Sequence, residues 1–293
     1  MFKKYALLAT LLVTTSANAM PLPHQARSAS FAPSIAAPVA GQVDFTAIVA
    51  LDDCSGSLVR FTTSLGSDSA MVLTNGHCFE GGFLNPGEVR VNVPSSRTFE
   101  LLSSDGQSTL TTLTAKLVLY ATMTRTDVTL YQIQNTYDEI EKAYGVKALT
   151  LSTTHPEAGT PIAIPSGYWK KIYSCSIDRF IYELHEGGWV FSDSIRYLQP
   201  GCEIIGGTSG SPIVNTATHE MIGINNTSNE DNEQCTLDNP CEVDEQGKIT
   251  VIHNASYGQE VYWFYACLDS QNAIDLNLPG CALPKPQPPQ SSR

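Results

Sequence analysis

Residues 206–215 read GGTSGSPIVN, a glycine-rich loop that carries two serines and runs directly into an apolar segment. Glycines beside a serine let backbone N–H groups turn toward one point, because no Cβ atoms clash there. Acyl transfer needs donors of this kind already in place for the oxyanion of its tetrahedral intermediate. The loop therefore indicates a reactive serine at the start of a strand, with Ser209 and Ser211 as the two candidates.

Two further strings supply residue types that such a serine needs, because its hydroxyl is a poor nucleophile unless a base takes its proton. Residues 74–78 read TNGHC at the end of an apolar run, and residues 126–130 read TDVTL at the opening of another. The imidazole of the first string titrates in the right range for a base, and it needs an acid to fix its tautomer. Asp127 is the candidate acid, while Asp52 and Asp53 are rivals that do not open a strand.

Short apolar runs separated by Gly, Asp, Asn and Ser continue along most of the chain, for example FTAIVAL (45–51), VTLYQI (128–133) and KITVIH (248–253). Their β-branched and aromatic residues are typical of strands. Only TYDEIEKAYG (136–145) has a helical pattern, with a second possible turn near 261–268. Because strands do not alternate with long helices, the pattern favours an all-β barrel or sandwich over a doubly wound α/β sheet.

Together these strings resemble the chymotrypsin/trypsin-fold serine endopeptidases, especially their bacterial secreted branch. His77 followed by Cys78 matches the family's histidine–cysteine string, and Asp127 opens a strand as the family's aspartate does. Residues 207–212 (GTSGSP) match the nucleophile motif, and the order histidine, aspartate, serine is that of the family. Residues 54–58 (CSGSL) resemble the strand that precedes the histidine.

The resemblance implies an all-β fold of two antiparallel six-stranded β-barrels, with the active site in the cleft between them and few short helices. It covers roughly residues 43–268, with the first barrel at about 43–135 and the second at about 148–268. Residues 269–293 form a C-terminal extension, and the composition of its end, LPKPQPPQSSR (283–293), predicts disorder.

The same resemblance implies an enzyme that hydrolyses peptide bonds through an acyl-enzyme on Ser209. His77 acts as general base and then as general acid, and Asp127 orients it. The backbone N–H groups of Gly207 and Ser209 form the oxyanion hole. Such an enzyme needs no cofactor, and its partners are protein or peptide substrates.

The specificity pocket is harder to locate. In the family its base lies shortly before the nucleophile, which points to Glu203, and one wall should contain Asn225 and Asn226. A buried carboxylate at the base favours lysine or arginine in the substrate, because an unpaired buried charge is costly. Thr208 replaces the aspartate of vertebrate-type members, which pairs with the N-terminus freed by activation, so that ion pair is not expected here.

Eight cysteines are present, and the resemblance implies a disulfide between Cys54 and Cys78. The connectivity of the others is open in the sequence, and the pairings we favour are Cys175–Cys202, Cys235–Cys241 and Cys267–Cys281. No C-x-x-C or H-x-x-x-H spacing occurs, so no metal site is expected. Residues 228–247 are acidic and turn-rich, which is typical of a solvated insertion pinned by one disulfide, with calcium binding as the alternative.

Residues 1–19, MFKKYALLATLLVTTSANA, combine a basic start, a short apolar stretch and small residues at the end, which indicates a secretory signal peptide. Residues 20–42 are expected to be a pro-segment or loose N-terminal arm. The exported chain is expected to be secreted or periplasmic, where disulfides persist. We expect a monomer without membrane contact after signal cleavage. A net charge of −12 argues against nucleic-acid binding.

Three other functions fit parts of the sequence. An α/β-hydrolase would use G-x-S-x-G and the order serine, acid, histidine. His219 and His253 do follow Ser209, but Ser211 stands where that motif needs glycine, and the strand-rich pattern opposes the fold. A catalytically silent binding module on the chymotrypsin fold, or a serine esterase, would also be compatible with the three strings.

Overall fold

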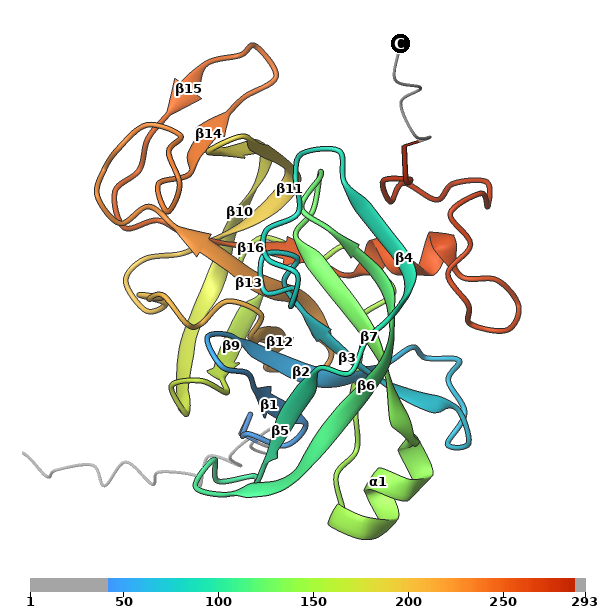
Figure 1. Ribbon diagram of the computed structural model, residues 1–293. Coiled ribbons are helices and arrows are strands. Elements are labelled where there is room, and N and C mark those ends of the chain that lie inside the picture. The colour runs from blue at the N-terminus through green and yellow to red at the C-terminus, as the bar shows by residue number, and fades with distance from the viewer. Residues whose placement is uncertain (1–41, 288–293) are drawn as a thin grey trace, which may run out of the picture. The chain divides into compact units, whose positions relative to one another are not determined.

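Two mainly antiparallel β-sheets contain nearly all the regular structure of the computed structural model, which describes residues 42–287 (Figure 1). The expected signal peptide and all of the expected N-terminal arm except its last residue lie outside the described residues. The elements are β1 (Ile48–Ala50), β2 (Ser55–Arg60), β3 (Ser69–Thr74), β4 (Val89–Pro94), β5 (Thr98–Leu102), β6 (Thr109–Thr122), β7 (Val128–Thr136), α1 (Tyr137–Tyr144), β8 (Leu149–Thr150), β9 (Pro161–Ser166), β10 (Lys171–Glu186), β11 (Trp189–Tyr197), β12 (Pro212–Asn215), β13 (Met221–Ser228), β14 (Cys241–Val243), β15 (Ile249–Thr250), β16 (Ser256–Glu260) and the 3₁₀-helix η1 (Tyr262–Cys267).

The first sheet contains a closed barrel. Its strands follow the order β1-β5-β6-β7-β3-β2, and β1 also pairs with β2, which joins the two ends of this path. β4 pairs with β6 outside the ring, and the short β8 lies parallel to β2. The antiparallel pairing of β3 with β7 brings together the two candidate strings of the first half, because each string adjoins one of these strands.

The second sheet repeats this plan. Its path β11-β16-β13-β12-β9-β10 is joined at its ends by the pairing of β10 with β11, and β14 and β15 continue from β10. All pairings within it are antiparallel. The expected all-β chymotrypsin-like fold is therefore confirmed.

The one α-helix of the described residues forms where its local signals predict it. Thr136 caps the N-terminus of α1 by accepting from the Glu139 backbone N–H, and the Glu139 side chain accepts from the Thr136 backbone in return. Gly145 ends the helix with φ of 70°, a left-handed conformation that glycine adopts without a Cβ penalty. The second expected turn is the 3₁₀-helix η1.

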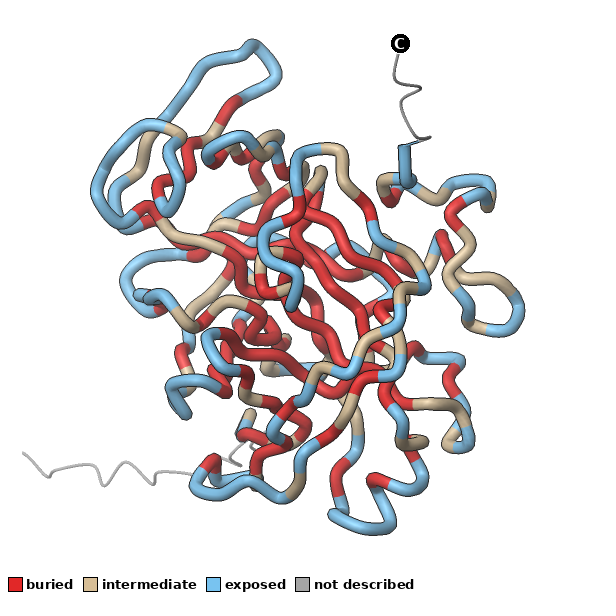
Figure 2. The backbone as a smooth tube through the Cα atoms, viewed as in Figure 1, coloured by how far each residue is buried: buried red, intermediate tan, exposed pale blue. Residues whose placement is uncertain are grey.

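The buried side chains form several clusters, and Figure 2 shows buried residues along the central strands and exposed ones in the loops. One cluster lies within the second sheet and is rich in isoleucine, including Ile162, Ile195 and Ile213. Another includes both Leu73 of β3 and Ile224 of β13. Side chains of the two sheets therefore share one close-packed core, which holds the two sheets against each other.

The C-terminal extension packs against the first sheet. Leu283 is only 3% exposed and belongs to the same apolar cluster as Tyr120 of β6. The Tyr120 hydroxyl donates to the Pro284 carbonyl oxygen at 3.0 Å, and the disulfide Cys267–Cys281 closes the loop before it. The predicted disorder of the tail is therefore wrong at its start, because tertiary burial outweighs its composition. Within residues 42–287, no helix is long and apolar enough to cross a membrane.

Candidate active site

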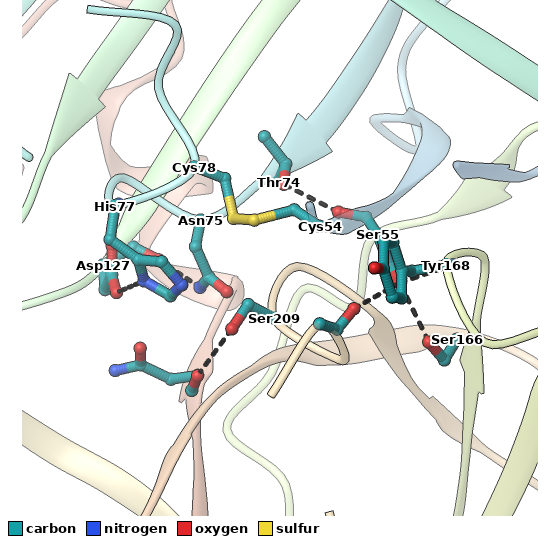
Figure 3. Close-up of a disulfide and its surroundings, with 12 residues drawn as sticks. Cys54, Ser55, Thr74, Asn75, His77, Cys78, Asp127, Ser166, Tyr168 and Ser209 are labelled. Carbon is teal, nitrogen blue, oxygen red and sulfur yellow. Dashed lines mark hydrogen bonds and ion pairs between the residues drawn. A yellow bond between two sulfur atoms is a disulfide. The ribbon is translucent and has the colours of Figure 1, made fainter. Parts of the chain in front are cut away.

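His77 and Asp127 are brought together by neighbouring strands of the first barrel. β3 ends at Thr74, β7 begins at Val128, and Thr74 lies opposite Thr129 in their antiparallel register. His77 Nδ1 is 2.7 Å from Asp127 Oδ2, and the His77 backbone N–H donates to Asp127 Oδ1 at 3.0 Å (Figure 3). Two contacts to one carboxylate fix both the ring orientation and the tautomer of the imidazole.

Steric space and hydrogen bonding restrict which residues fit at positions 75 and 76, just before His77. A Cβ atom on Gly76 would lie 2.1 Å from the Thr122 carbonyl oxygen and 2.7 Å from Asp127 Oδ1, so only glycine fits there. The side chain of Asn75 donates to the Asp127 carbonyl oxygen at 2.8 Å. Asp127 itself is fully buried, so its charge acts on the imidazole with little screening by water.

The pKa of His77 is raised above its usual value of 6.5. Burial by itself lowers the pKa of an imidazole, but the charge of Asp127 and its hydrogen bond act in the opposite direction. The negative charges of Glu186 and Asp238 add smaller increases, and together these effects outweigh burial. The imidazole is therefore a stronger base than an isolated histidine.

Ser209 lies in the loop before β12 of the second barrel and lines the same cavity as His77 and Asp127. Its Oγ donates to the Asn226 carbonyl oxygen at 3.3 Å (Figure 3). Within the described residues no hydrogen bond joins Ser209 to His77. Catalytic hydrogen bonds are often loose before substrate binds, and transfer of the serine proton requires Oγ to turn from Asn226 toward the imidazole.

The loop that carries Ser209 is held by Ser55 of β2. The Ser55 backbone N–H donates to the Ser209 carbonyl oxygen at 2.7 Å, and its Oγ donates to the Gly207 carbonyl oxygen at 3.3 Å and contacts Ser166 Oγ at 3.0 Å (Figure 3). A Cβ atom on Gly210 would lie 2.1 Å from the Ser55 carbonyl oxygen, and the φ of Gly210 is +80°. A strand of the first barrel therefore supports the serine loop of the second.

The expected oxyanion donors have no protein acceptor. Among residues 42–287, neither the Gly207 nor the Ser209 backbone N–H donates a hydrogen bond. Trp169 Nε1 donates to the Gly206 carbonyl oxygen at 2.7 Å. Because the N–H and C=O of a trans peptide point in opposite directions, this bond directs the Gly207 N–H away from Trp169. Trp169 has no motif around it, and sequence reasoning missed it.

Residues 54–224, more than half of the chain, match the model of the trypsin-like peptidase domain. The chain belongs to the trypsin-like peptidase family. The comparison with curated proteins found no match to this chain.

Several solved protease structures are similar to this chain at low identity. The MamO protease domain of Magnetospirillum magneticum is 13% identical with a TM-score of 0.45, over 75% of this chain and 94% of that one. The active form of the Rv3671c protease of M. tuberculosis is 13% identical with a TM-score of 0.44, over 76% and 79%. The chymotrypsin of Cellulomonas bogoriensis is 12% identical with a TM-score of 0.38, over 75% and 91%. Likenesses this distant carry no functional argument, which rests on the family match and the site.

The cavity of this trypsin-like peptidase is acidic. Its lining includes Glu186, Glu230 and Asp238 and contains no lysine or arginine among the described residues. Phe83 forms an aromatic wall, with its ring centroid 5.8 Å from that of His77. Negative charge without a protein cation raises the local concentration of positively charged ligands.

Glu186, at the end of β10, is the most unusual of these acids. It is 6% exposed, and its Oε1 accepts from Thr227 Oγ1 and from the Asp238 backbone N–H, each at 2.9 Å. Burial raises the pKa of Glu186 to about 7, against the effect of these hydrogen bonds and of His77. Sequence reasoning missed this residue because it lies in an unremarkable hairpin, HEGGW.

The residues expected in the specificity pocket separate into two groups. Asn225 and Asn226 line the cavity, and both are buried. Glu203 is exposed and is not among the cavity-lining residues. The cause is its neighbour Cys202, which is buried and bonded to Cys175, so this segment turns the glutamate outward. The structure therefore does not bring Glu203 into the cleft.

The rival catalytic residues lie elsewhere. Asp52 and Asp53 are exposed, and the imidazole of His77 is hydrogen-bonded to Asp127 instead. Ser211 is buried but does not line the cavity.

Three more positions named in the sequence are also outside the catalytic contacts. His219 and His253 do not line the cavity, and His253 Nε2 faces the Glu230 carbonyl oxygen at 3.2 Å. Thr208 is buried and its hydroxyl donates to the Ile205 carbonyl oxygen, so its side chain has a local structural role in place of an ion pair.

All eight cysteines are bonded, and the pairings are those that the sequence suggested: Cys54–Cys78, Cys175–Cys202, Cys235–Cys241 and Cys267–Cys281. Cys54–Cys78 links β2 to the loop of the histidine (Figure 3). In the acidic insertion, the buried Asn229 donates to the Glu233 and Pro240 carbonyl oxygens, each at 3.0 Å, beside Cys235–Cys241. The insertion is therefore organised by protein contacts.

Proposed function

We propose that the protein is a serine endopeptidase that uses Ser209 as nucleophile, His77 as general base and Asp127 as the acid that orients it. One observation carries this proposal: the Asp127 carboxylate lies 2.7 Å from His77 Nδ1 in a cavity that Ser209 also lines. Membership of a peptidase family gives this arrangement its reaction class.

In the first half of the reaction the Ser209 hydroxyl turns from the Asn226 carbonyl, and its proton moves to His77 Nε2 as Oγ bonds to the scissile carbonyl carbon. The resulting oxyanion accepts hydrogen bonds from the Gly207 and Ser209 N–H groups, which have no acceptor in the described protein. One such donor lowers the barrier by about 3 kcal/mol.

Collapse of this intermediate breaks the peptide C–N bond, and His77 returns the proton to the leaving amine. Water then attacks the acyl-enzyme with His77 again as base, and the proton finally returns to Ser209. Asp127 stays ionised and stabilises the imidazolium in both halves. The reaction needs no cofactor.

The substrates that this cleft favours are peptides with basic side chains. Glu186, Glu230 and Asp238 line it without a lysine or arginine from the described residues to neutralise them. This proposal assigns to Glu186 the attraction for basic residues that the sequence suggested for Glu203. Four disulfides support a location outside the cytosol, secreted or periplasmic, and the N-terminal 19 residues have the composition of an export signal.

Labelling with a fluorophosphonate probe tests the nucleophile. We expect one label per chain in the wild-type protein, loss of label in Ser209→Ala, and retention in Ser211→Ala. Absence of label in the wild-type protein would support a silent binding module. Cleavage of a peptide library separates an endopeptidase from an esterase, since an esterase would take the label and hydrolyse esters without cutting internal peptide bonds.

A further inference from the structure

A second group of chemically reactive side chains lies outside the catalytic cavity. His155 follows β8, Asp193 lies within β11, and Glu260 ends β16. His155 Nε2 is 2.9 Å from Glu260 Oε1 and 3.3 Å from Asp193 Oδ2, and the three atoms all lie within 4.8 Å of one another. None of these residues lines the catalytic cavity.

Glu260 presents a buried oxygen to this cluster. Its side chain is 1% exposed, and Oε2 accepts from Trp263 Nε1 at 3.1 Å. Oε1 has no hydrogen-bond partner in the described part of the chain, although it faces His155. A carboxylate oxygen buried at this depth needs a positive partner, which is either the protonated imidazole of His155 or a bound cation.

In its neutral form, His155 presents a nitrogen lone pair to the same point. Its Nδ1 is 2.5 Å from the Pro156 carbonyl oxygen, and because a carbonyl only accepts, Nδ1 carries the hydrogen. In the neutral imidazole Nε2 then bears the lone pair. The ring is fixed by aromatic neighbours, with centroids 4.2 Å from Phe180 and 5.4 Å from Tyr262.

No lysine or arginine of the described residues forms an ion pair with the carboxylates of this cluster. In the described residues, no lysine or arginine nitrogen lies within 4.0 Å of the Asp193 or Glu260 carboxylates. Asp193 is about one-third exposed, so the site is open to solvent on that side. Two ionised carboxylates that face one point repel each other unless a positive charge lies between them, either the protonated imidazole of His155 or a metal ion that binds the neutral ring.

We propose that His155, Asp193 and Glu260 bind a divalent metal ion, and that Zn²⁺ is the ion these ligands suit. One imidazole nitrogen and two carboxylate oxygens are ligand types of zinc. Tetrahedral bonds of about 2.0–2.2 Å separate neighbouring ligand atoms by about 3.3–3.6 Å. The observed 2.9 and 3.3 Å need only a small outward adjustment to reach this spacing.

The surrounding contacts are those that orient metal ligands. The Pro156 carbonyl fixes the tautomer of His155, and Trp263 holds the second oxygen of Glu260. The exposed side at Asp193 leaves a fourth position for water. Calcium fits poorly, because it needs about six to eight oxygen ligands.

Bound zinc would brace the second barrel. It would tie the segment between β8 and β9 to β11 and β16, which pair with each other. β16 also pairs with β13, where Gly258 lies opposite Asn225 of the catalytic cavity. The expected effect is therefore a higher melting temperature, and the site does not depend on the proposed hydrolysis.

The test uses the full chain in a Ser209→Ala background, so that self-cleavage cannot alter it, and without a histidine tag. After treatment with EDTA, equilibrium dialysis against Zn²⁺ with elemental analysis gives stoichiometry and affinity, and thermal melting gives stability. We expect one zinc per chain and a rise in melting temperature. His155→Ala and Asp193→Asn should each weaken binding by about 100-fold or more.

His185→Ala is the matched control, because His185 Nε2 lies 2.8 Å from the single carboxylate of Glu183 and has no second one among the described residues. Its zinc binding should equal that of the parent. Because Asp193 is partly exposed, Asp193→Asn keeps the experiment decisive if His155→Ala unfolds. The proposal would be overturned if His155→Ala and Asp193→Asn both bound zinc as tightly as the parent, if the parent bound no zinc, or if only Ca²⁺ stabilised it. The three residues would then form a hydrogen-bonded cluster only.

Discussion

Asp127 holds His77 at two atoms, accepting from the backbone N–H at Oδ1 and facing ring Nδ1 at Oδ2. The first contact fixes the position of the residue and the second fixes the tautomer of its ring. A carboxylate with both tasks cannot be replaced by its amide without loss, because the amide nitrogen would offer a hydrogen where a lone pair is needed.

Asp127→Asn should therefore abolish most activity while leaving the fold intact. We expect kcat/KM at pH 7 to fall by about 10³–10⁴-fold. Rates with a cleaved peptide and a circular dichroism melt provide the measurement. Asp52→Asn is the control, since Asp52 is exposed and should change the rate less than about twofold. A large loss in Asp52→Asn with little in Asp127→Asn would contradict the assignment.

The bond from Trp169 Nε1 to the Gly206 carbonyl predicts a positioning role for an exposed indole. Trp169→Phe keeps an aromatic ring but removes the donor, so the Gly206–Gly207 peptide can rotate. We expect kcat to fall by about tenfold, below the effect of deleting an oxyanion donor outright, with KM nearly unchanged. Steady-state kinetics on the best library peptide gives both values.

Tyr168→Phe is the control for that variant, because it changes the adjacent aromatic residue without removing the Trp169 bond. A merely structural role for Trp169 would lower the melting temperature and leave kcat of the folded protein unchanged. An increase in KM with constant kcat would instead assign Trp169 to substrate binding.

The acid limb of the pH–rate profile reports the pKa of His77. Hydrolysis needs the neutral imidazole, so kcat/KM falls as the pH drops through the pKa of His77, which lies above 6.5. The pKa of Glu186 is about 7, and the negative charge of its ionised form raises the pKa of His77. Glu186→Gln removes that charge, so the limb should move to lower pH by a fraction of a pH unit.

Glu203→Gln makes the same substitution on an exposed carboxylate outside the cavity and should leave the profile unchanged. The same pair of variants tests the preference for basic peptides, which should weaken only in Glu186→Gln. A shift of the limb to higher pH, or an equal effect in both variants, would contradict the role of Glu186.

The sequence predicted those features that depend on residues close together in the chain. The α1 helix follows from its capping residues, and Ser209, His77 and Asp127 each lie in a short string with recognisable chemistry. Glu186 lies in no such string. It reaches the cavity only because the hairpin of β10 and β11 ends there.

The sequence pattern did not predict strand β16, because its residues are mostly polar although the strand is buried. β16 reads SYGQE, which has no apolar run, yet all five residues are buried because the strand pairs with β11 and β13 inside the sheet. The side chain of Gln259 donates to Ser194 Oγ at 3.0 Å. Hydrophobic periodicity cannot detect such a strand, since its burial depends on contacts between residues far apart in sequence.

The C-terminal extension tests whether tertiary burial can order a segment whose composition predicts disorder. Leu283 is 3% exposed in the cluster that contains Tyr120, although it begins a proline-rich segment. Leu283→Ala should lower the free energy of unfolding by about 2 kcal/mol, at the lower end for buried leucines because the site lies near the surface and can partly collapse. Urea titration with constant m-value gives the change. Leu65→Ala, at a residue that is 64% exposed, should change the free energy by no more than about 0.5 kcal/mol. Identical midpoints for the two variants would show that the extension does not contribute to the core.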